Sequence, residues 1–312
     1  MRVKHFLDLA DITEADLRAM LAEGRRRKAA RAGAPKGAAD ADAPLKDHLL
    51  ALIFEKNSTR TRFSFDVAMR QLGGGSIVVS ASDMQLGRGE TIADTARVLS
   101  RYVDAMMLRT GPHEKLVELA GHASVPVLNG LTDFSHPCQI LADLMTVEER
   151  FGDLQPRRAL WCGDGNNVAV SWIQACALLG WELTLACPEG YRGDLGPVLA
   201  WAEARGRAPT LSSDLSAAAT GAEIVIADTF VSMGQDDAEA RLADLAPFAV
   251  TADVMARAAP NALFLHCLPA HRGEEVSAEV IDGPQSAVWD EAENRVHAQK
   301  AALLWCFGKI AL

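Results

Sequence analysis

A run of six apolar residues, Leu49–Phe54, constrains the fold more than any other stretch of this chain. A continuous apolar run of this length is typical of a parallel strand that is buried on both faces. Apolar residues at helical spacing follow between Phe63 and Leu72, and three consecutive glycines end them. The sequence therefore predicts a buried strand that leads into a helix, the repeating unit of α/β folds.

Five polar residues occupy the junction between this strand and its helix: Ser58, Thr59, Arg60, Thr61 and Arg62. The first backbone N–H groups of a helix have no partner within it, and the helix dipole favours an anion there. Hydroxyl and guanidinium groups add donors suited to phosphate oxygens. The alternative is a capped helix with solvated arginines, but positive charge is unfavourable at a helix start. We expect an anion to bind at this junction.

The strand and helix pattern recurs along the chain, whose character changes near residues 151–153. Further strands are predicted at 76–80, 105–109, 125–129, 159–162, 181–187, 223–228 and 262–266. Helices are predicted at 91–102, 168–179, 199–204, 214–220 and 293–304, and another follows Pro137. This order predicts an α/β protein of two doubly wound domains, each with a mostly parallel sheet.

Two further polar residues are predicted to lie near the anion site. In open parallel sheets, ligands bind at the carboxyl ends of the strands. Arg109 ends the 105–109 strand, which places it beside residues 58–62. His136 precedes a proline at the first position of a helix, so its side chain can face the same edge. A lone histidine is more often structural, but three polar groups at one edge favour a functional role.

Composition excludes several classes of partner. The 312 residues are 49% hydrophobic and 23% charged, as in globular proteins. A net charge of −10 argues against bulk nucleic-acid binding, which needs a basic surface. No apolar run approaches membrane-spanning length, and six cysteines without a C-x-x-C pair favour a reduced, cytoplasmic protein. The basic run 25–28 is expected to be the solvated end of the first helix, before a mobile loop to about residue 46.

Four motifs, taken in order, resemble those of the aspartate/ornithine carbamoyltransferase family. They are Ser58 to Arg62, His136 to Gln139, Asp228 with residues 232–234, and His266 to Pro269. The resemblance covers essentially the whole chain. The first two motifs are similar to those of the whole family, and the last two resemble the ornithine-specific members.

The resemblance implies transfer of a carbamoyl group from carbamoyl phosphate to the side-chain amine of L-ornithine, giving citrulline and phosphate. It implies a cytoplasmic homotrimer acting in arginine biosynthesis, with no cofactor and no metal. The implied domains are a carbamoyl-phosphate domain (residues 1–147), an ornithine domain (148–288) and a C-terminal helix (289–312) that returns to the first domain. A cis Leu268–Pro269 bond is also implied.

Site residues are implied by the same resemblance. Those for carbamoyl phosphate are Ser58, Thr59, Arg60, Thr61, Arg62, Arg109, His136, Gln139, Cys267, Leu268 and Arg295, with Gln85 donated by a neighbouring chain. Those for ornithine are Asn167, Asp228, Ser232 and Met233. The implied catalytic residues are Arg109, His136, Asp228 and Cys267.

Other interpretations stay open. Aspartate as acceptor is disfavoured by Asp228 and by Cys267, because a second substrate carboxylate would need a cation. An N-acylated ornithine is a further possible acceptor. A nucleotide-binding module is disfavoured because Val168 stands where a third glycine would be needed. A zinc site formed by His266, Cys267 and His271 is disfavoured because adjacent strand residues point to opposite faces.

Overall fold

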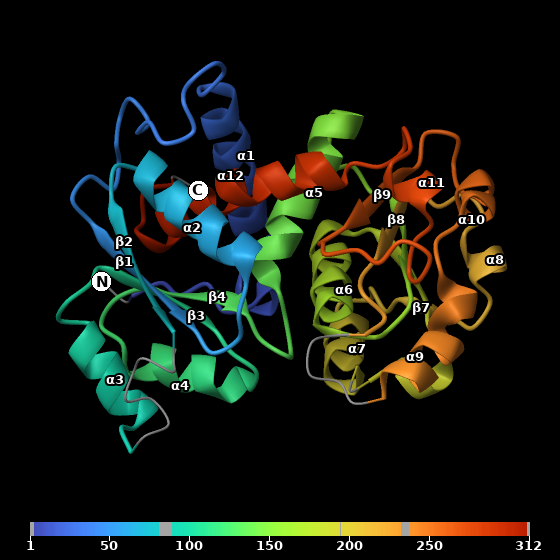
Figure 1. Cartoon of the computed structure of the whole chain (residues 1–312), viewed down its shortest axis with the longest axis horizontal. Helices are drawn as coiled ribbons and strands as arrows, with labels where there is room; N and C mark the ends of the chain where they lie inside the picture. The colour runs from blue at the N-terminus through green and yellow to red at the C-terminus, as the bar shows by residue number, and fades with distance from the viewer. Residues whose placement is uncertain (1–2, 81–88, 194, 232–236, 311–312) are drawn as a thin grey trace. The chain divides into compact units, whose positions relative to one another are not determined.

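A computed structural model of the chain describes residues 3–80, 89–193, 195–231 and 237–310. The chain divides into two compact units (Figure 1). The first consists of Met1–Met145 together with Glu293–Leu312, and the second of Thr146–Ala292. Among the residues described, no helix is both long and apolar enough to cross a membrane.

The first unit contains a parallel sheet of four strands in the order β2-β1-β3-β4. The strands are β1 (Leu49–Phe54), β2 (Gly75–Ser80), β3 (Ala105–Arg109) and β4 (Val127–Leu131). The chain leaves β1 for β2 on one side and returns to the other side of β1 for β3, so the strand order reverses between β1 and β3. Phe54 pairs with Arg109, and the residues that follow Phe54 therefore lie beside Arg109.

Helices cover both faces of this sheet. The helices are α1 (Glu14–Ala29), α2 (Thr59–Gln71), α3 (Ile92–Leu99), α4 (His113–His122), α5 (Pro137–Phe151) and α12 (Val288–Cys306). Figure 1 shows α3 and α4 on one face, with α1, α2 and α12 on the other. Apolar residues of β1 and β3 pack against α4 in a buried core that includes Ile53, Met106, Leu116 and Leu119. The helices packed on the two faces of the sheet hold the end of β1 in place, and α2 begins five residues after that end.

The basic run at the end of α1 is not simply solvated, as had been expected. The side chain of Arg27 is 5% exposed and pairs with Asp40 at 2.7 Å and with Asp42 at 2.9 Å. Asp40 also pairs with Lys300 of α12 at 2.7 Å. The expectation was wrong for Arg27 because carboxylates from the following segment neutralise it, which sequence spacing does not reveal. These ion pairs join α1, residues 40–42 and α12 within the first unit.

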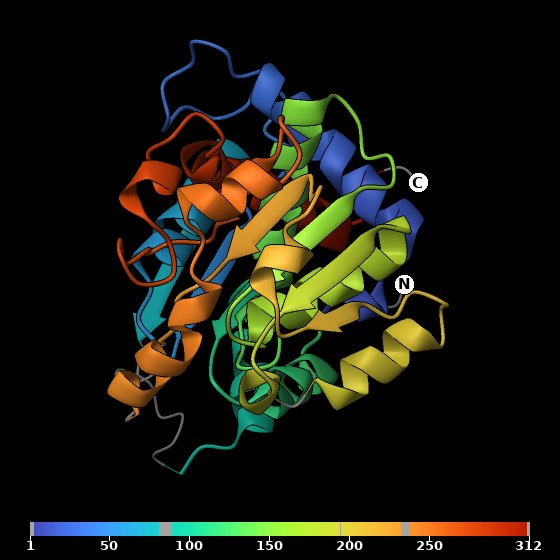
Figure 2. The same cartoon turned by 90° about the vertical axis from the view of Figure 1, so that its right-hand side faces the viewer.

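The second unit contains a parallel sheet of five strands in the order β7-β6-β5-β8-β9 (Figure 2). The strands are β5 (Arg158–Cys162), β6 (Glu182–Ala186), β7 (Thr210–Ser212), β8 (Ile224–Ala227) and β9 (Leu263–His266). Its helices are α6 (Asn167–Leu179), α7 (Gly196–Glu203), α8 (Leu215–Ala218), α9 (Ala238–Leu245), α10 (Ala252–Arg257) and α11 (Ala278–Ile281). The strand order reverses between β5 and β8, which is where ligands bind in such sheets.

The predicted fold class is confirmed, and the differences concern individual elements. β4 begins at Val127 rather than at residue 125, since Pro126 has no N–H to donate to a ladder. β7, α4, α9, α10 and α11 were not predicted. β7 is short and its first two residues are exposed, so it has no apolar run. α12 begins five residues before the expected start, with Asp290 and Glu291 in its first turn, where the helix dipole favours carboxylates.

Candidate active site

The five residues of the first motif, Ser58 to Arg62, differ in how far the start of α2 buries their side chains. Ser58 caps the helix, and its Oγ accepts a hydrogen bond from Thr61 N at 3.2 Å. Thr61 is 1% exposed, whereas the side chains of Thr59 and Arg62 are exposed. Arg60 is half-buried. The structure thus directs Thr61 into the unit and leaves Thr59 and Arg62 at its surface.

Two arginines from distant parts of the chain meet at Thr61. Its Oγ1 accepts hydrogen bonds from Arg109 Nη1 at 3.2 Å and from Arg295 Nη2 at 2.9 Å. Arg295 also donates to Gln139 Oε1, and Gln139 Nε2 donates to Asp143 Oδ1 at 2.8 Å. Four of the expected carbamoyl-phosphate residues therefore lie in one connected group at the carboxyl ends of β1 and β3.

His136 lies in the electrostatic field of this group. It is 3% exposed at the start of α5, where its carbonyl oxygen accepts from Gln139 N at 3.0 Å. Burial, and then the charges of Arg295, Arg109 and Arg60, hold the pKa of His136 well below its ordinary value. The imidazole is therefore neutral at pH 7. Because three arginines surround this buried histidine, the site is suited to an anion.

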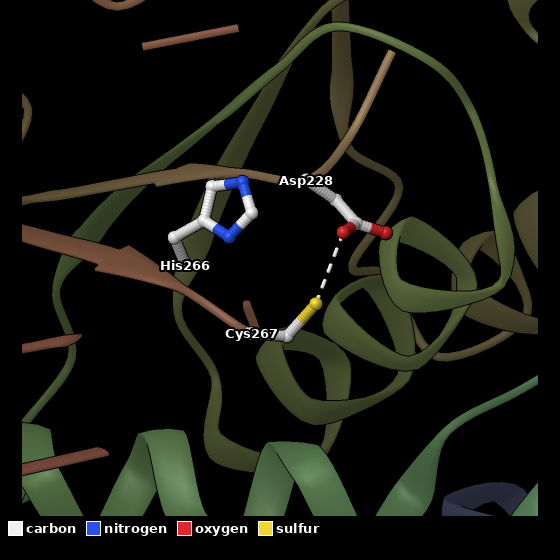
Figure 3. Close-up of side chains that lie close together, drawn as sticks. All are labelled: Asp228, His266 and Cys267. Atoms are coloured by element: carbon white, nitrogen blue, oxygen red, sulfur yellow. Dashed lines mark hydrogen bonds between the residues drawn. The ribbon is translucent and has the colours of Figure 1, made fainter. Parts of the chain in front are cut away.

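In the second unit, polar residues follow two neighbouring strands. Ala227 of β8 pairs with His266 of β9, so the next residues, Asp228 and Cys267, lie side by side at the sheet edge. Cys267 Sγ donates to Asp228 Oδ1 at 3.0 Å (Figure 3). Asp228 Oδ2 accepts from Asn166 Nδ2 at 2.7 Å. These contacts place a carboxylate, a thiol and an amide together.

Asn166 is a residue that sequence reasoning missed. Its Oδ1 caps α6 by accepting from Val168 N at 2.9 Å and from Ala169 N at 3.2 Å. Asn167, the expected ornithine residue, is the first residue of α6. An asparagine just before an apolar helix is a recognisable N-cap signal, and it could have marked Asn166. One side chain thus fixes the helix start and orients Asp228.

A buried ion pair supports the same edge and was also missed. Arg241 of α9 donates to Asp164 Oδ2 at 2.5 Å and to the carbonyl oxygen of Phe230 at 3.0 Å. Burial raises the pKa of Asp164, and the charge of Arg241 opposes that rise. The pair was not foreseen because 77 residues separate its members along the chain. It ties the segment after β8 to the turn after β5.

The argument against a shared cation site at His266 and Cys267 was wrong. Ligand atoms of Asp228, His266 and Cys267 all lie within 4.8 Å of one another (Figure 3). β9 ends at His266 and Leu268 has a φ of 58°, so strand alternation no longer applies beyond His266. His271 belongs instead to a second cluster, with Glu274 and Glu275. Among the described residues these two clusters have metal-ligand spacing, and their geometry alone does not assign an ion.

Some expected residues lie outside the described part of the chain. These are Gln85, Ser232 and Met233. The Leu268–Pro269 bond is cis, which confirms that expectation. Leu268 N donates to His266 Nδ1 at 2.9 Å.

Comparison with known proteins identifies one family along nearly the whole chain. Residues 4–149 match the family model described as aspartate/ornithine carbamoyltransferase, carbamoyl-P binding domain, and residues 156–306 match that for the Asp/Orn binding domain. The chain is 62% identical to an ornithine carbamoyltransferase from Rhizorhabdus wittichii, covering 98% of this chain and 99% of the relative. It is 57% identical to that of Caulobacter vibrioides, covering 98% of each.

A solved structure agrees with these relatives. The ornithine carbamoyltransferase from Pyrococcus furiosus superimposes with a TM-score of 0.91 and 46% identity, over 99% of this chain and 98% of that one. Two doubly wound units that match the carbamoyl-P and Asp/Orn binding domains place the chain in the carbamoyltransferase class. The chain belongs to the aspartate/ornithine carbamoyltransferase family.

Proposed function

We propose that the protein is an enzyme that transfers the carbamoyl group of carbamoyl phosphate to the side-chain amine of L-ornithine, giving L-citrulline and phosphate. The observation that carries this proposal is the meeting of Arg109 and Arg295 at Thr61, beside a neutral His136. Two guanidinium groups and a helix start suit a phosphate dianion. The high identity to ornithine carbamoyltransferases favours ornithine as the acceptor.

The phosphate group of the donor is held by the start of α2 and the two arginines. A hydroxyl has one O–H donor and two acceptor lone pairs. Because Thr61 Oγ1 accepts from both arginines, its O–H hydrogen is directed at the ligand. Residues Ser58 to Arg62 supply backbone and side-chain donors, and Gln85 of an adjacent chain completes the clamp.

The carbonyl oxygen of the carbamoyl group gains negative charge as the amine attacks it. Arg109, Thr61 and a neutral His136 N–H are the donors for that charge, since donors aimed at a developing oxyanion lower the barrier. Gln139 holds the carbamoyl amide, and its contacts with Arg295 and Asp143 keep its side chain in place. The bond to the phosphate oxygen then breaks, and phosphate leaves.

The ornithine amine must lose its proton to become the nucleophile. An amine with the pKa of lysine, about 10.4, costs about 4.6 kcal/mol to neutralise at pH 7. Asp228, which Asn166 orients, accepts hydrogen bonds from this amine and so positions it. A desolvated pocket with several arginines lowers the pKa of the amine, and the proton passes to solvent. Cys267 and the Leu268 backbone lie beside it, and Asn167, Ser232 and Met233 hold the rest of ornithine.

The working enzyme is a cytoplasmic homotrimer that acts in arginine biosynthesis. Support for assembly comes from large apolar side chains on the surface of the first unit, with Phe63 65%, Ile77 49% and Tyr102 70% exposed. Ile77 lies on β2, which is an edge strand of the sheet. All six cysteines are free thiols, which suits a reducing compartment. The domain limits implied by the family, 1–147, 148–288 and 289–312, belong to the same proposal.

A product assay tests the acceptor. The protein is incubated with carbamoyl phosphate and, in parallel, with ornithine, N-acetylornithine, aspartate or putrescine, and carbamoylated products are identified by mass spectrometry. Citrulline from ornithine should dominate. If carbamoylaspartate or acetylcitrulline dominates, the acceptor is aspartate or N-acetylornithine instead of ornithine. Phosphate release without any carbamoylated product would overturn the transfer reaction.

A further inference from the structure

The backbone after β9 is held by an unusual hydrogen bond to His266. Leu268 N donates to His266 Nδ1 at 2.9 Å, so Nδ1 is the acceptor and carries no proton. The proton of a neutral imidazole must then reside on Nε2. The other tautomer, and the imidazolium ion, would each place an N–H against the N–H of Leu268. The bond therefore exists in only one protonation state of His266.

This bond stabilises a backbone conformation that leucine rarely adopts. Leu268 has a φ of 58°, in the left-handed region, which is unfavourable for a residue with a side chain. The same turn directs Cys267 Sγ at Asp228 Oδ1. Figure 3 shows the His266 ring beside these two side chains. Loss of the bond would release the turn and with it the position of Cys267.

Glu275 faces the other nitrogen of the ring. Its Oε1 lies 3.4 Å from His266 Nε2, a charge contact longer than a good hydrogen bond, and Nε2 has no hydrogen-bond partner among the described residues. Both side chains are 0% exposed. The same oxygen accepts from His271 N at 2.5 Å, which fixes the carboxylate. Burial raises the pKa of Glu275, but the contacts with His266 and with His271 N outweigh it and hold the pKa below its ordinary value. A buried carboxylate acceptor thus faces Nε2.

We propose that Glu275 is a positioning residue for carbamoyl transfer: it holds the His266 proton on Nε2, so that Nδ1 can accept from Leu268 N and set the Cys267–Leu268 backbone. A carboxylate accepts hydrogen bonds and cannot donate one, so it stabilises only the Nε2–H tautomer. Glu275 acts through His266 and does not touch substrate. The inference rests on the proposed function, in which Cys267 and Leu268 face the substrates.

The substitution Glu275→Gln tests the tautomer with little change in size. An amide can donate as well as accept, so it permits the tautomer with a proton on Nδ1. In this variant kcat/KM for ornithine should fall by roughly 10- to 100-fold, because the backbone beside the amine is displaced. KM for carbamoyl phosphate should change less than kcat/KM for ornithine, because most of its expected contacts, residues 58–62, Arg109 and Arg295, belong to the first unit. Glu274→Gln, a neighbouring exposed glutamate, is the matched control and should behave like the wild type.

A double variant separates positioning from mere packing. An asparagine side-chain oxygen accepts from the backbone N–H two residues on, without any tautomer. His266→Asn combined with Glu275→Gln should therefore have a higher kcat/KM for ornithine than Glu275→Gln alone. If Glu275 matters only for packing, removing a second buried side chain lowers activity further. A double variant no better than Glu275→Gln would overturn the proposal.

Ring-¹⁵N histidine NMR gives a readout that does not depend on activity. The His266 signals are identified by their absence in His266→Asn. The wild type should show an unprotonated Nδ1 and a protonated Nε2 at neutral pH, and Glu275→Gln should show both tautomers if it folds. A wild-type His266 that is protonated at Nδ1 refutes the proposal whatever the kinetics. The NMR result holds even if the wild type makes no citrulline, in which case the proposed function fails and the tautomer assignment stands.

Discussion

At the start of α2 the first unit gathers guanidinium groups, whereas the strand ends of the second unit gather a carboxylate, an amide and a thiol. In the first, Arg109 and Arg295 approach one hydroxyl, and burial together with their charges lowers the pKa of His136. In the second, Asn166 and Cys267 both donate to Asp228. Both regions lie where the strand order of a parallel sheet reverses. The same topology thus presents opposite charge, and the side chains decide which ligand it takes.

The largest effect is expected from an experiment that asks whether the cationic region at the start of α2 is complete within one chain. Arg60→Ala removes a resident phosphate donor, and Gln85→Ala removes the donor expected from a neighbour. Each homotrimer should be nearly inactive. When the two variants are refolded together in equal amounts, about a quarter of interfaces keep both residues, given random mixing into rings. Citrulline production should recover to about that fraction of the wild-type rate.

Mass measurement of the mixed trimers is the control for this experiment. Mixed assemblies that show no recovery would mean that Gln85 serves its own chain or no site at all. The cationic region at the start of α2 would then be formed by residues of a single subunit.

The second prediction removes one charge from the cationic region. Arg295→Met should lower kcat/KM for carbamoyl phosphate by about 10²- to 10³-fold, because one donor to the charge that develops on the leaving phosphate is lost. It should also raise the pKa of His136, because a positive charge that opposes its protonation is gone. Steady-state kinetics and an NMR titration measure the two effects. Arg150→Met, which removes a half-exposed arginine paired with Asp290, should change neither.

The third prediction removes the charge from the acidic region. Asp228→Asn keeps the size of the side chain but loses its negative charge, so ornithine binds more weakly and its amine is held less firmly. We expect kcat/KM for ornithine to fall by about 100-fold. Asp244→Asn, at an exposed carboxylate bonded to Tyr191, is the control. Equal losses for both substrates in isothermal titration would show that the two regions are not chemically separate.

The smallest effect concerns stability against pH. Burial, and then the charges of Lys300 and Lys28, lower the pKa of His297 on α12 from 6.5 to about 4, against an opposing effect of Glu293. Since its folded pKa lies below its unfolded pKa, the unfolded chain binds the extra proton, and stability falls as pH decreases from about 6.5 towards 4. One such proton contributes about 1.4 kcal/mol per pH unit within that window.

His297→Gln should remove this part of the slope. Urea unfolding of both proteins at several pH values between 4 and 7 measures the difference. An identical pH dependence in the variant would show that neither burial nor the neighbouring lysines shift the pKa of His297. Within the first unit, an effect of positive charge on a histidine pKa would then be limited to His136, near the start of α2.

The sequence predicted the elements that follow from local patterns. β1 and β3 have the predicted limits because both are continuous apolar runs, and Arg109 was placed at its sheet edge by topology alone. Arg295 was identified only by resemblance, since 234 residues separate it from Thr61. Asn166 and Glu275 were missed. Their roles depend on hydrogen bonds that form only after the strands are side by side, and no periodicity encodes those.

The position of Arg295 on the last helix means that its contact with Thr61 can form only late in synthesis of the chain. Thr61, Arg109 and Gln139 are made early, whereas Arg295 follows only after the second unit. At 5–20 residues per second, the intervening stretch takes roughly 8 to 30 s to translate. Throughout that interval the emerging polypeptide lacks one of the two arginines that meet at Thr61. A product truncated before residue 295 would keep the start of α2 but would lack Arg295, so the group of side chains that meets at Thr61 is complete only after the last helix has been synthesised.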